Sequence, residues 1–139
     1  MFLLEKAQHF FTALNAQNMN EVVEMISPSA DIRTPIGSFT GGEAYREWML
    51  MHFRALPDFT HEIWGLSAES GQTLAFELHA TGTHTGPLVL PSGEIAPTGR
   101  TLDVSAVDVW RFEDGLIVEY HLYFDLFDFL RQLGLAPIT

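Results

Sequence analysis

The sequence predicts an α+β fold in which N-terminal helices pack against a curved, mostly antiparallel sheet and leave a cone-shaped interior. Apolar residues recur at helical spacing up to Leu56, whereas the chain from Phe59 onward consists of short runs of β-branched and aromatic residues. Helices followed by strands are typical of this fold class. The 139 residues, 47% of them hydrophobic, are about one domain's worth of chain. We therefore expect a single domain over residues 1–139.

The N-terminal part predicts helices separated by polar or proline breaks. Residues 2–14 carry one apolar stripe and form a first helix. The polar stretch 15–18 offers capping side chains for a short second helix that Pro28 stops, and residues 30–34 follow as a strand. The stretch 40–43 has the form of a capping box and opens a third helix. The inner stripe of that helix consists of Tyr45, Trp48, Met49, His52, Phe53 and Leu56.

The C-terminal part predicts an antiparallel sheet and a last short helix. Strands are expected over residues 59–68, 73–81, 102–112 and 116–124. The Asp114-Gly115 pair is a strong signal for a tight turn between the last two strands. The 19 residues from Gly82 to Arg100 hold four Gly and three Pro, and a connection of this length predicts a lid or an interface arm. Residues 126–133 form a helix that Gly134 ends.

The composition is strongly acidic. Seven Lys and Arg against 18 Asp and Glu give a formal charge of -11, which repels phosphate backbones and anionic lipids and disfavours nucleic acid and membrane partners. The absence of Cys excludes disulfides and thiolate nucleophiles, and it fits a reducing compartment. No apolar run is long enough to cross a membrane, and Glu5, Lys6 and His9 interrupt the stretch that a signal peptide would need. We therefore expect a cytoplasmic protein.

The last predicted hairpin gathers ionisable side chains on one face. If the turn is centred on Asp114 and Gly115 and the strands pair without interruption, Asp108 lies opposite His121. The polar face then carries Asp108, Trp110, Glu119, His121, Tyr123 and Asp125. The other face carries Val107, Val109, Arg111, Val118, Tyr120, Leu122 and Phe124.

This facing has two interpretations. A carboxylate and a histidine in an aromatic pocket suit general acid-base catalysis, because the carboxylate orients the imidazole while burial raises the carboxyl pKa toward working pH. Alternatively, the polar face is solvated and the apolar face is the core. The apolar face would also suit a sheet-to-sheet contact in a dimer.

Short motifs spread over nearly the whole chain form a recognisable series. They are FFTALN at 10–15, ALPDF at 55–59, GTHTG at 82–86, RFEDG at 111–115, and Asp125 followed by QLG at 132–134. In order and spacing, the series resembles the SnoaL-like polyketide cyclases of the nuclear transport factor 2-like superfamily. The resemblance implies an interior pocket on the side of the ionisable hairpin face, a homodimer through the outer sheet face, and no cofactor.

The resemblance also implies a role for the end of the last strand. In the polyketide cyclases, a carboxylate there is the acid-base group for an intramolecular aldol closure, and Asp125 occupies the matching place. His121 would be its partner and Asp108 a donor or orienting group. His121 stands where many relatives carry Trp, which leaves the substrate class open. Asp125 would equally serve as the N-cap of the helix that starts at Leu126.

Residues 107–112, VDVWRF, also resemble the ketosteroid isomerases. In those enzymes an Asp at the position of Asp108 stays protonated in an apolar site and donates to the developing enolate oxygen. Thr34 stands in place of their general-base Asp, and Phe10 stands in place of their Tyr donor. Because two of the three groups are missing, we do not expect steroid isomerisation. A partly buried ion pair with His121 is the alternative role for Asp108.

Further side chains are candidates for substrate binding. His84 lies at a strand-to-loop border, where it could cover the pocket mouth or donate to loop carbonyls. His79 alternates with Glu77 along one strand and could line the cavity. The aromatic members of the substrate-binding set are Trp48, Phe53, Trp110 and Tyr123.

The remaining histidines predict no further chemistry. His52 is expected in the core, and His9 and His61 are expected at the surface. No His and carboxylate spacing matches a helical or loop metal signature, so no metal is expected.

These observations support two hypotheses about function. The first is a cofactor-independent acid-base enzyme acting on a small, apolar, carbonyl-bearing substrate, with aldol cyclisation ahead of isomerisation, hydrolysis or dehydration. The second is a non-catalytic small-molecule-binding or dimerisation module of the same fold.

Overall fold

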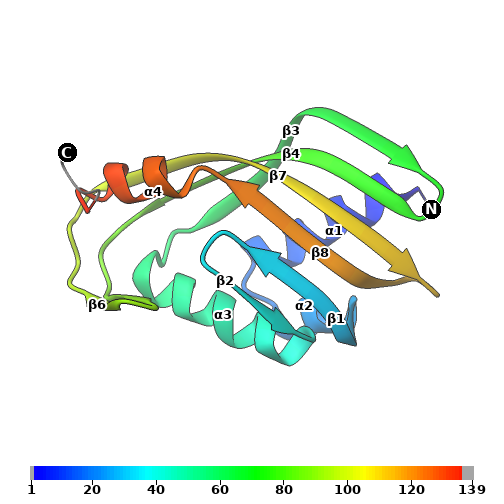
Figure 1. The fold of residues 1–139 in the computed structure, drawn as a ribbon, viewed down its shortest axis with the longest axis horizontal. Helices are drawn as coiled ribbons and strands as arrows, with labels where there is room; N and C mark the ends of the chain where they lie inside the picture. Colours follow the sequence, from blue (N-terminus) through cyan, green and yellow to red (C-terminus); the bar gives the residue numbers. More distant parts are fainter. Residues whose placement is uncertain (1, 136–139) are drawn as a thin grey trace.

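The computed structural model describes residues 2–135 and has the expected α+β architecture (Figure 1). The helices are α1 (Leu3–Asn15), α2 (Met19–Glu24), α3 (Gly42–Ala55) and α4 (Leu126–Gln132). The strands are β1 (Ile26–Thr34), β2 (Gly37–Thr40), β3 (Thr60–Ser70), β4 (Thr73–Thr83), β5 (Leu88–Leu90), β6 (Gly93–Ile95), β7 (Thr101–Glu113) and β8 (Leu116–Phe124).

A six-stranded sheet in the order β2-β1-β8-β7-β4-β3 organises the fold. Its strand pairs are antiparallel except for β1 and β8, which run parallel. The sheet is strongly curved, with α1 behind it and α3 along its lower edge in Figure 1. The predicted curved, mostly antiparallel sheet with helices packed on it is therefore confirmed. Among residues 2–135, no helix has the length and apolar character that crossing a membrane requires.

The aromatic core joins α1 to the concave side of the sheet. The expected apolar stripe of α1 is buried, and Trp110 on β7 lies at the centre of the core with no exposed surface. The Trp110 ring lies 4.9 Å from that of Phe10, 5.6 Å from that of Phe11 and 5.0 Å from that of Phe76, measured between centroids. Aromatic pairs at such distances add to the stabilisation from burial alone. This packing fixes the central part of β7 against α1.

The helix boundaries match the sequence expectation with two exceptions. Asn18 caps α2 by accepting from the backbone N–H of Glu21 at 3.3 Å, as the polar break predicts. Pro28 does not end that helix but lies inside β1, which begins at Ile26. The predicted capping box is also wrong, because α3 begins after Gly41 with φ 90° and no side-chain cap.

The turn between β7 and β8 has the predicted form. Asp114 and Gly115 have φ values of 50° and 80°. Two positive φ values are what a two-residue hairpin turn of the favoured twist requires. Glu113 pairs with Leu116, as the turn position predicts.

A β-bulge at Val118 then shifts the register of β8 against β7. Arg111 pairs with Glu119, and Asp108 pairs with Leu122 instead of His121. A one-residue shift sends every later side chain of the strand to the other face. The prediction that Asp108 and His121 share a face is therefore wrong, and so is an ion pair between them.

The long connection from Gly82 to Arg100 is an arm that contains the β5–β6 hairpin and docks on the C-terminal end of α3. The backbone N–H groups of Thr85 and Gly86 both donate to the carbonyl oxygen of Ala55, at 3.1 and 3.0 Å. Leu88 is buried in the core. Gly86 lies so close to the Arg54 carbonyl that no side chain fits there.

We predict that Gly86→Ala displaces this arm and lowers the melting temperature by several degrees, because the added Cβ would overlap the Arg54 carbonyl oxygen. Ser92→Ala is the control, since Ser92 is exposed in the turn between β5 and β6 of the same arm. Circular dichroism melts of both variants measure the effect. Equal melting temperatures for the two variants would contradict the docked arrangement of the arm.

Candidate functional site

A pocket of about 50 Å³ lies between α3, α4 and the concave face of the sheet. Most of its wall is aliphatic or aromatic, from Trp48 and Met49 on α3 to Phe129 on α4. Its polar side chains are His52, His61 and Tyr120. An apolar wall with a few polar groups is typical of small-molecule sites, but the volume of this pocket is well below the about 300–1,000 Å³ that such sites usually have.

Tyr120 connects the pocket to a group of buried polar side chains behind it. Its hydroxyl lies 3.2 Å from the hydroxyl of Tyr45 on α3, and its ring stacks on Trp110 at 5.1 Å. The Trp110 indole Nε1–H donates to Asp108 Oδ2 at 3.1 Å. Asp108 Oδ1 is buried and has no hydrogen-bond partner within residues 2–135. Asp108, Tyr120, Tyr45 and Trp110 are called the buried polar cluster below.

Burial sets the protonation of the buried polar cluster. It raises the pKa of Asp108 to about 7, and the Trp110 indole and the nearby Tyr120 hydroxyl offset part of that rise. Burial also raises the pKa of Tyr120 well above its ordinary value, with further contributions from Tyr45 and Asp108. Tyr120 is therefore a neutral hydrogen-bond donor at all working pH values, whereas Asp108 changes charge near neutrality.

His52 contributes a base to the pocket wall. Its Nδ1 lies 2.8 Å from the Trp48 carbonyl oxygen, to which only a protonated nitrogen can donate. The neutral imidazole therefore carries its lone pair on Nε2. Burial lowers the pKa of His52, and the hydrogen bond to the Trp48 carbonyl offsets this in part. His52 is thus neutral and able to accept a proton at pH 7.

His61 is buried beside His52, contrary to the expected surface position. The Asn15 side chain holds its backbone on both sides, accepting from the His61 N–H and donating to the His61 carbonyl, each at 2.8 Å. Burial, and then electrostatic repulsion between the protonated forms of His61 and His52, lower the pKa of His61 to about 3. Its Nδ1 is buried without a partner among residues 2–135. A neutral His61 therefore supplies a second polar group to an apolar wall.

The structure divides the predicted catalytic residues among different places. Asp108 and Trp110 face the interior, as expected. His121 and Tyr123 follow the bulge and lie on the outer face, where Tyr123 is 57% exposed. The family resemblance implies that the ionisable face of the hairpin faces the pocket, and this is wrong for His121 and Tyr123.

Asp125 is exposed at the end of β8 and serves as the N-cap of α4. Its side chain accepts from the backbone N–H of Asp128 at 3.0 Å. It does not line the pocket. Of its two predicted roles, the geometry supports the cap.

The predicted substrate-binding residues also separate. Trp48 lines the pocket, whereas Phe53 is buried in the core and does not line it. His79 lies on the outer face and pairs with Asp103. His84 is fully buried, with Nδ1 2.9 Å from the Thr98 hydroxyl, and ties the two ends of the arm together.

Sequence reasoning missed the pocket roles of Tyr120, His52 and His61. An uninterrupted hairpin places Tyr120 on the face opposite to that of Asp108. The bulge reverses this and puts both side chains on the same face, and the sequence does not reveal the bulge. A signal did exist on α3, because Tyr45 and His52 share the predicted inner stripe with Trp48.

Together these groups can perform proton transfer in an apolar setting. His52 can accept a proton, and Tyr120 can donate a hydrogen bond to an oxygen that becomes negative. When Asp108 loses its proton near neutral pH, its carboxylate can compete for the hydroxyl proton of Tyr120. The pocket contains no charged side chain in its wall, so a neutral, apolar molecule fits it best.

Comparisons with known proteins agree on one family and one fold. The family model for the SnoaL-like domain matches residues 7–120. TsrD from Streptomyces laurentii superposes with a TM-score of 0.82 at 22% identity, over 96% of this chain and 96% of that chain. A candidate polyketide cyclase, IdmH from Streptomyces antibioticus, gives 0.77 at 24% identity, over 94% of this chain and 96% of that chain.

A third solved structure, a candidate SnoaL-like polyketide cyclase from Jannaschia sp. CCS1, gives a TM-score of 0.82 at 19% identity, over 96% of this chain and 92% of that chain. At these identities the likeness establishes the fold. No curated protein matches the sequence.

We predict that Asp108→Asn removes a pH-dependent loss of stability. The carboxyl pKa is about 7 in the folded chain against an ordinary 3.8. Between these values the folded state holds a proton that the unfolded state has released, so the free energy of unfolding falls as pH rises. The span corresponds to about 4 kcal/mol.

Urea denaturation of both proteins at about pH 4 and about pH 7 measures this effect. The free energy of unfolding of the variant should increase relative to wild type by up to about 4 kcal/mol as pH rises. His61 titrates in the opposite direction in both proteins, so the difference isolates Asp108. A pH-independent difference would show that Asp108 ionises normally.

Proposed function

Because the chain belongs to the SnoaL-like domain family, we propose that it is a cofactor-independent acid-base enzyme that acts on a small, apolar, carbonyl-bearing molecule. The reaction that we propose is an intramolecular aldol closure, as in the polyketide cyclases that it resembles. The observation that carries the proposal is Tyr120, which lines an apolar pocket next to the buried carboxyl of Asp108.

The proposed reaction begins with proton removal next to a carbonyl group. His52 Nε2 takes the proton, and the Tyr120 hydroxyl donates a hydrogen bond to the oxygen of the resulting enolate. The enolate carbon then attacks a second carbonyl of the same molecule and forms the carbon-carbon bond. The new alkoxide takes the proton back from His52, so the enzyme returns to its starting state.

Asp108 acts through Tyr120 and is a positioning residue in this scheme. Below a pH of about 7 its carboxyl is protonated and leaves the Tyr120 hydroxyl proton free for the substrate. Above that pH the carboxylate competes for the same proton. Activity should therefore fall as pH rises through about 7, and Asp108→Asn should remove this fall.

Substrate entry requires the pocket to widen near α4. Phe124 and Phe129 lie 5.6 Å apart between ring centroids and form part of the wall at this end. Gln132 holds α4 to β7 by accepting from the Asp103 N–H at 2.6 Å and donating to its carbonyl at 2.8 Å. Phe129 and Leu133 are also buried, so widening the pocket would have to move these two side chains together with the helix.

A non-catalytic binding module is the second candidate, favoured by the almost wholly apolar wall. The homodimer implied by the family resemblance stays a prediction. Its support is the exposed pair of Val107 and Tyr123, which face each other across β7 and β8 on the outer face.

The test measures by proton NMR how fast the methyl protons of acetophenone exchange with deuterium in D2O. Binding of acetophenone is measured separately as quenching of tryptophan fluorescence, because Trp48 lines the pocket. Wild type should exchange faster than buffer alone. Tyr120→Phe and His52→Asn should each lower the protein-dependent rate by about a hundredfold, the lower end of what one acid-base group contributes. His9→Asn is the matched control, since His9 is exposed and pairs with Glu21.

Two results would contradict this proposal. Binding without exchange would favour the binding module. Loss of exchange in Asp125→Asn, with Tyr120→Phe and His52→Asn unaffected, would transfer the acid-base role to Asp125.

A further inference from the structure

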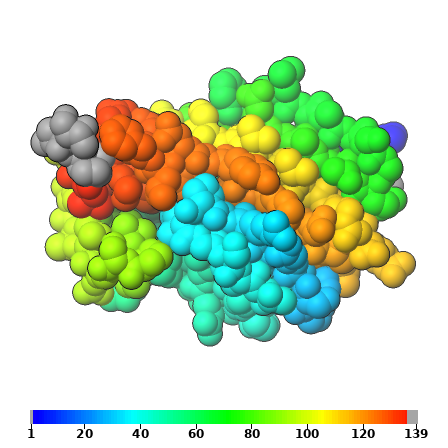
Figure 2. All heavy atoms as spheres, viewed as in Figure 1, coloured from blue at the N-terminus to red at the C-terminus, as the bar shows by residue number. Residues whose placement is uncertain are grey.

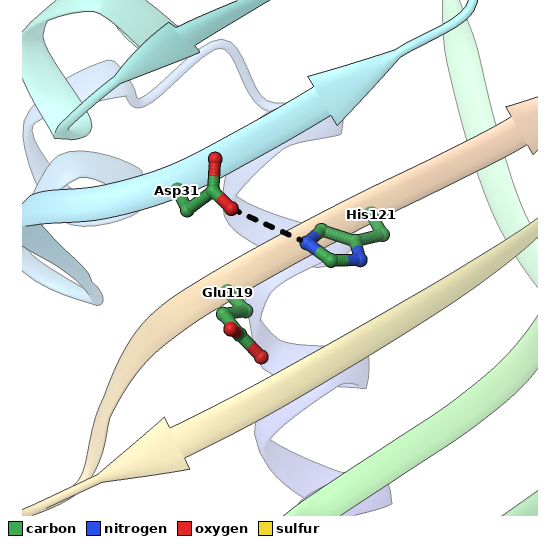
Figure 3. A group of neighbouring side chains, drawn as sticks. All are labelled: Asp31, Glu119 and His121. Carbon is green, nitrogen blue, oxygen red and sulfur yellow. Dashed lines mark ion pairs between the residues drawn. The ribbon is translucent and has the colours of Figure 1, made fainter.

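Three potential metal ligands meet on the outer face of the sheet, away from the pocket. Asp31 on β1 pairs with Glu119 on the parallel strand β8, and His121 follows two residues later. Figure 3 shows their side chains in front of the strands, with the first helix behind the sheet. No helix covers this part of β1 and β8 in the view of Figure 2. The bulge at Val118 is what places Glu119 and His121 on this side.

The ligand atoms of the three side chains converge. One atom from each lies within 4.8 Å of the others. His121 Nε2 is 3.7 Å from Asp31 Oδ2, which is too long for a hydrogen bond. This nitrogen is buried, yet it has no hydrogen-bond partner among residues 2–135. A cation bound between this buried nitrogen and the two carboxylates would give the nitrogen the partner that it lacks.

Neighbouring arginines orient the carboxylates without using all their oxygens. Arg33 Nε donates to Asp31 Oδ2, and Arg111 Nε donates to Glu119 Oε2, each at 3.0 Å. Asp31 Oδ2, the oxygen that lies 3.7 Å from His121 Nε2, therefore accepts from Arg33, whereas Asp31 Oδ1 and Glu119 Oε1 take no part in these bonds. With Glu113, which also pairs with Arg111, the group has three carboxylates and two guanidinium groups, so its net charge is negative. Hydrogen bonds to ligating carboxylates are a regular feature of metal sites.

The donor set selects the class of ion. One imidazole and two carboxylates suit Zn²⁺ and similar divalent transition-metal ions, with metal-ligand distances of about 2.0–2.2 Å. The side chains of Asp31, Glu119 and His121 are 42%, 38% and 21% exposed, so an ion can reach them from solvent.

We propose that Asp31, Glu119 and His121 form a site for a divalent transition-metal ion that links β1 to β8. The sequence predicts no metal, because the three ligands lie far apart in the chain and follow no helical or loop signature. Tyr120 lies between Glu119 and His121 but points to the other face of β8. The site therefore stabilises the parallel strand pair and stands apart from the pocket chemistry.

Zn²⁺ titration of the chelator-treated full chain by isothermal calorimetry tests the proposal, together with melting temperatures. Wild type should bind one Zn²⁺ per chain and melt at a higher temperature with it. His121→Ala and Glu119→Gln should each weaken binding by about tenfold or more and lose the zinc-dependent rise. His79→Ala is the matched control, because His79 is another histidine on the outer face beside a carboxylate, Asp103.

Melting curves without zinc show whether each variant is folded. Absence of zinc binding by wild type at millimolar concentrations would overturn the proposal. So would unchanged affinity in folded His121→Ala, or loss of binding in His79→Ala instead. None of these measurements depends on turnover.

Discussion

The extra residue at Val118 is the constraint on which both candidate sites depend. After it, Tyr120 and Leu122 face the interior while Glu119, His121 and Tyr123 face outward. Without the bulge, the carboxylate of Glu119 and the imidazole of His121 would enter an aromatic core that has no partners for them, at a cost of several kcal/mol. A single backbone irregularity therefore decides which chemistry the pocket contains. Bulges commonly have this function near sites, because they re-aim the side chains that follow.

The buried polar cluster is the part of the core that packing alone does not explain. An apolar side chain at position 108 would avoid the unpartnered Oδ1, but it would leave the Trp110 indole N–H without its acceptor. Retaining a carboxyl there raises its pKa to about 7, and the folded chain loses stability toward neutral pH as a result. Groups with strongly shifted pKa values next to a cavity are typical of acid-base sites. The cost in stability is thus consistent with a role in proton transfer.

Much of the fold followed from patterns that depend on local sequence, and the site did not. Helical spacing places α1 and α3, and Asp114-Gly115 places the last turn, because each depends on nearby residues. The facing of β8 depends on whether Val118 adds a residue to the strand, which no local preference of valine reveals. The surface position expected for His61 is wrong for a related reason, because its ring packs against Phe59 and against Phe11, which is far away in sequence.

Alternation along β8 separates two kinds of chemistry by the thickness of one sheet. Inward residues meet apolar walls, where burial keeps Tyr120 and His52 neutral and favours proton transfer with uncharged molecules. Outward residues meet water and the guanidinium groups of Arg33 and Arg111, which pair with the carboxylates of Asp31 and Glu119. Glu119 and His121 directly precede and follow Tyr120, so residues of the two faces are neighbours in the chain. The alternation of the strand nevertheless keeps the outer-face side chains apart from the pocket chemistry.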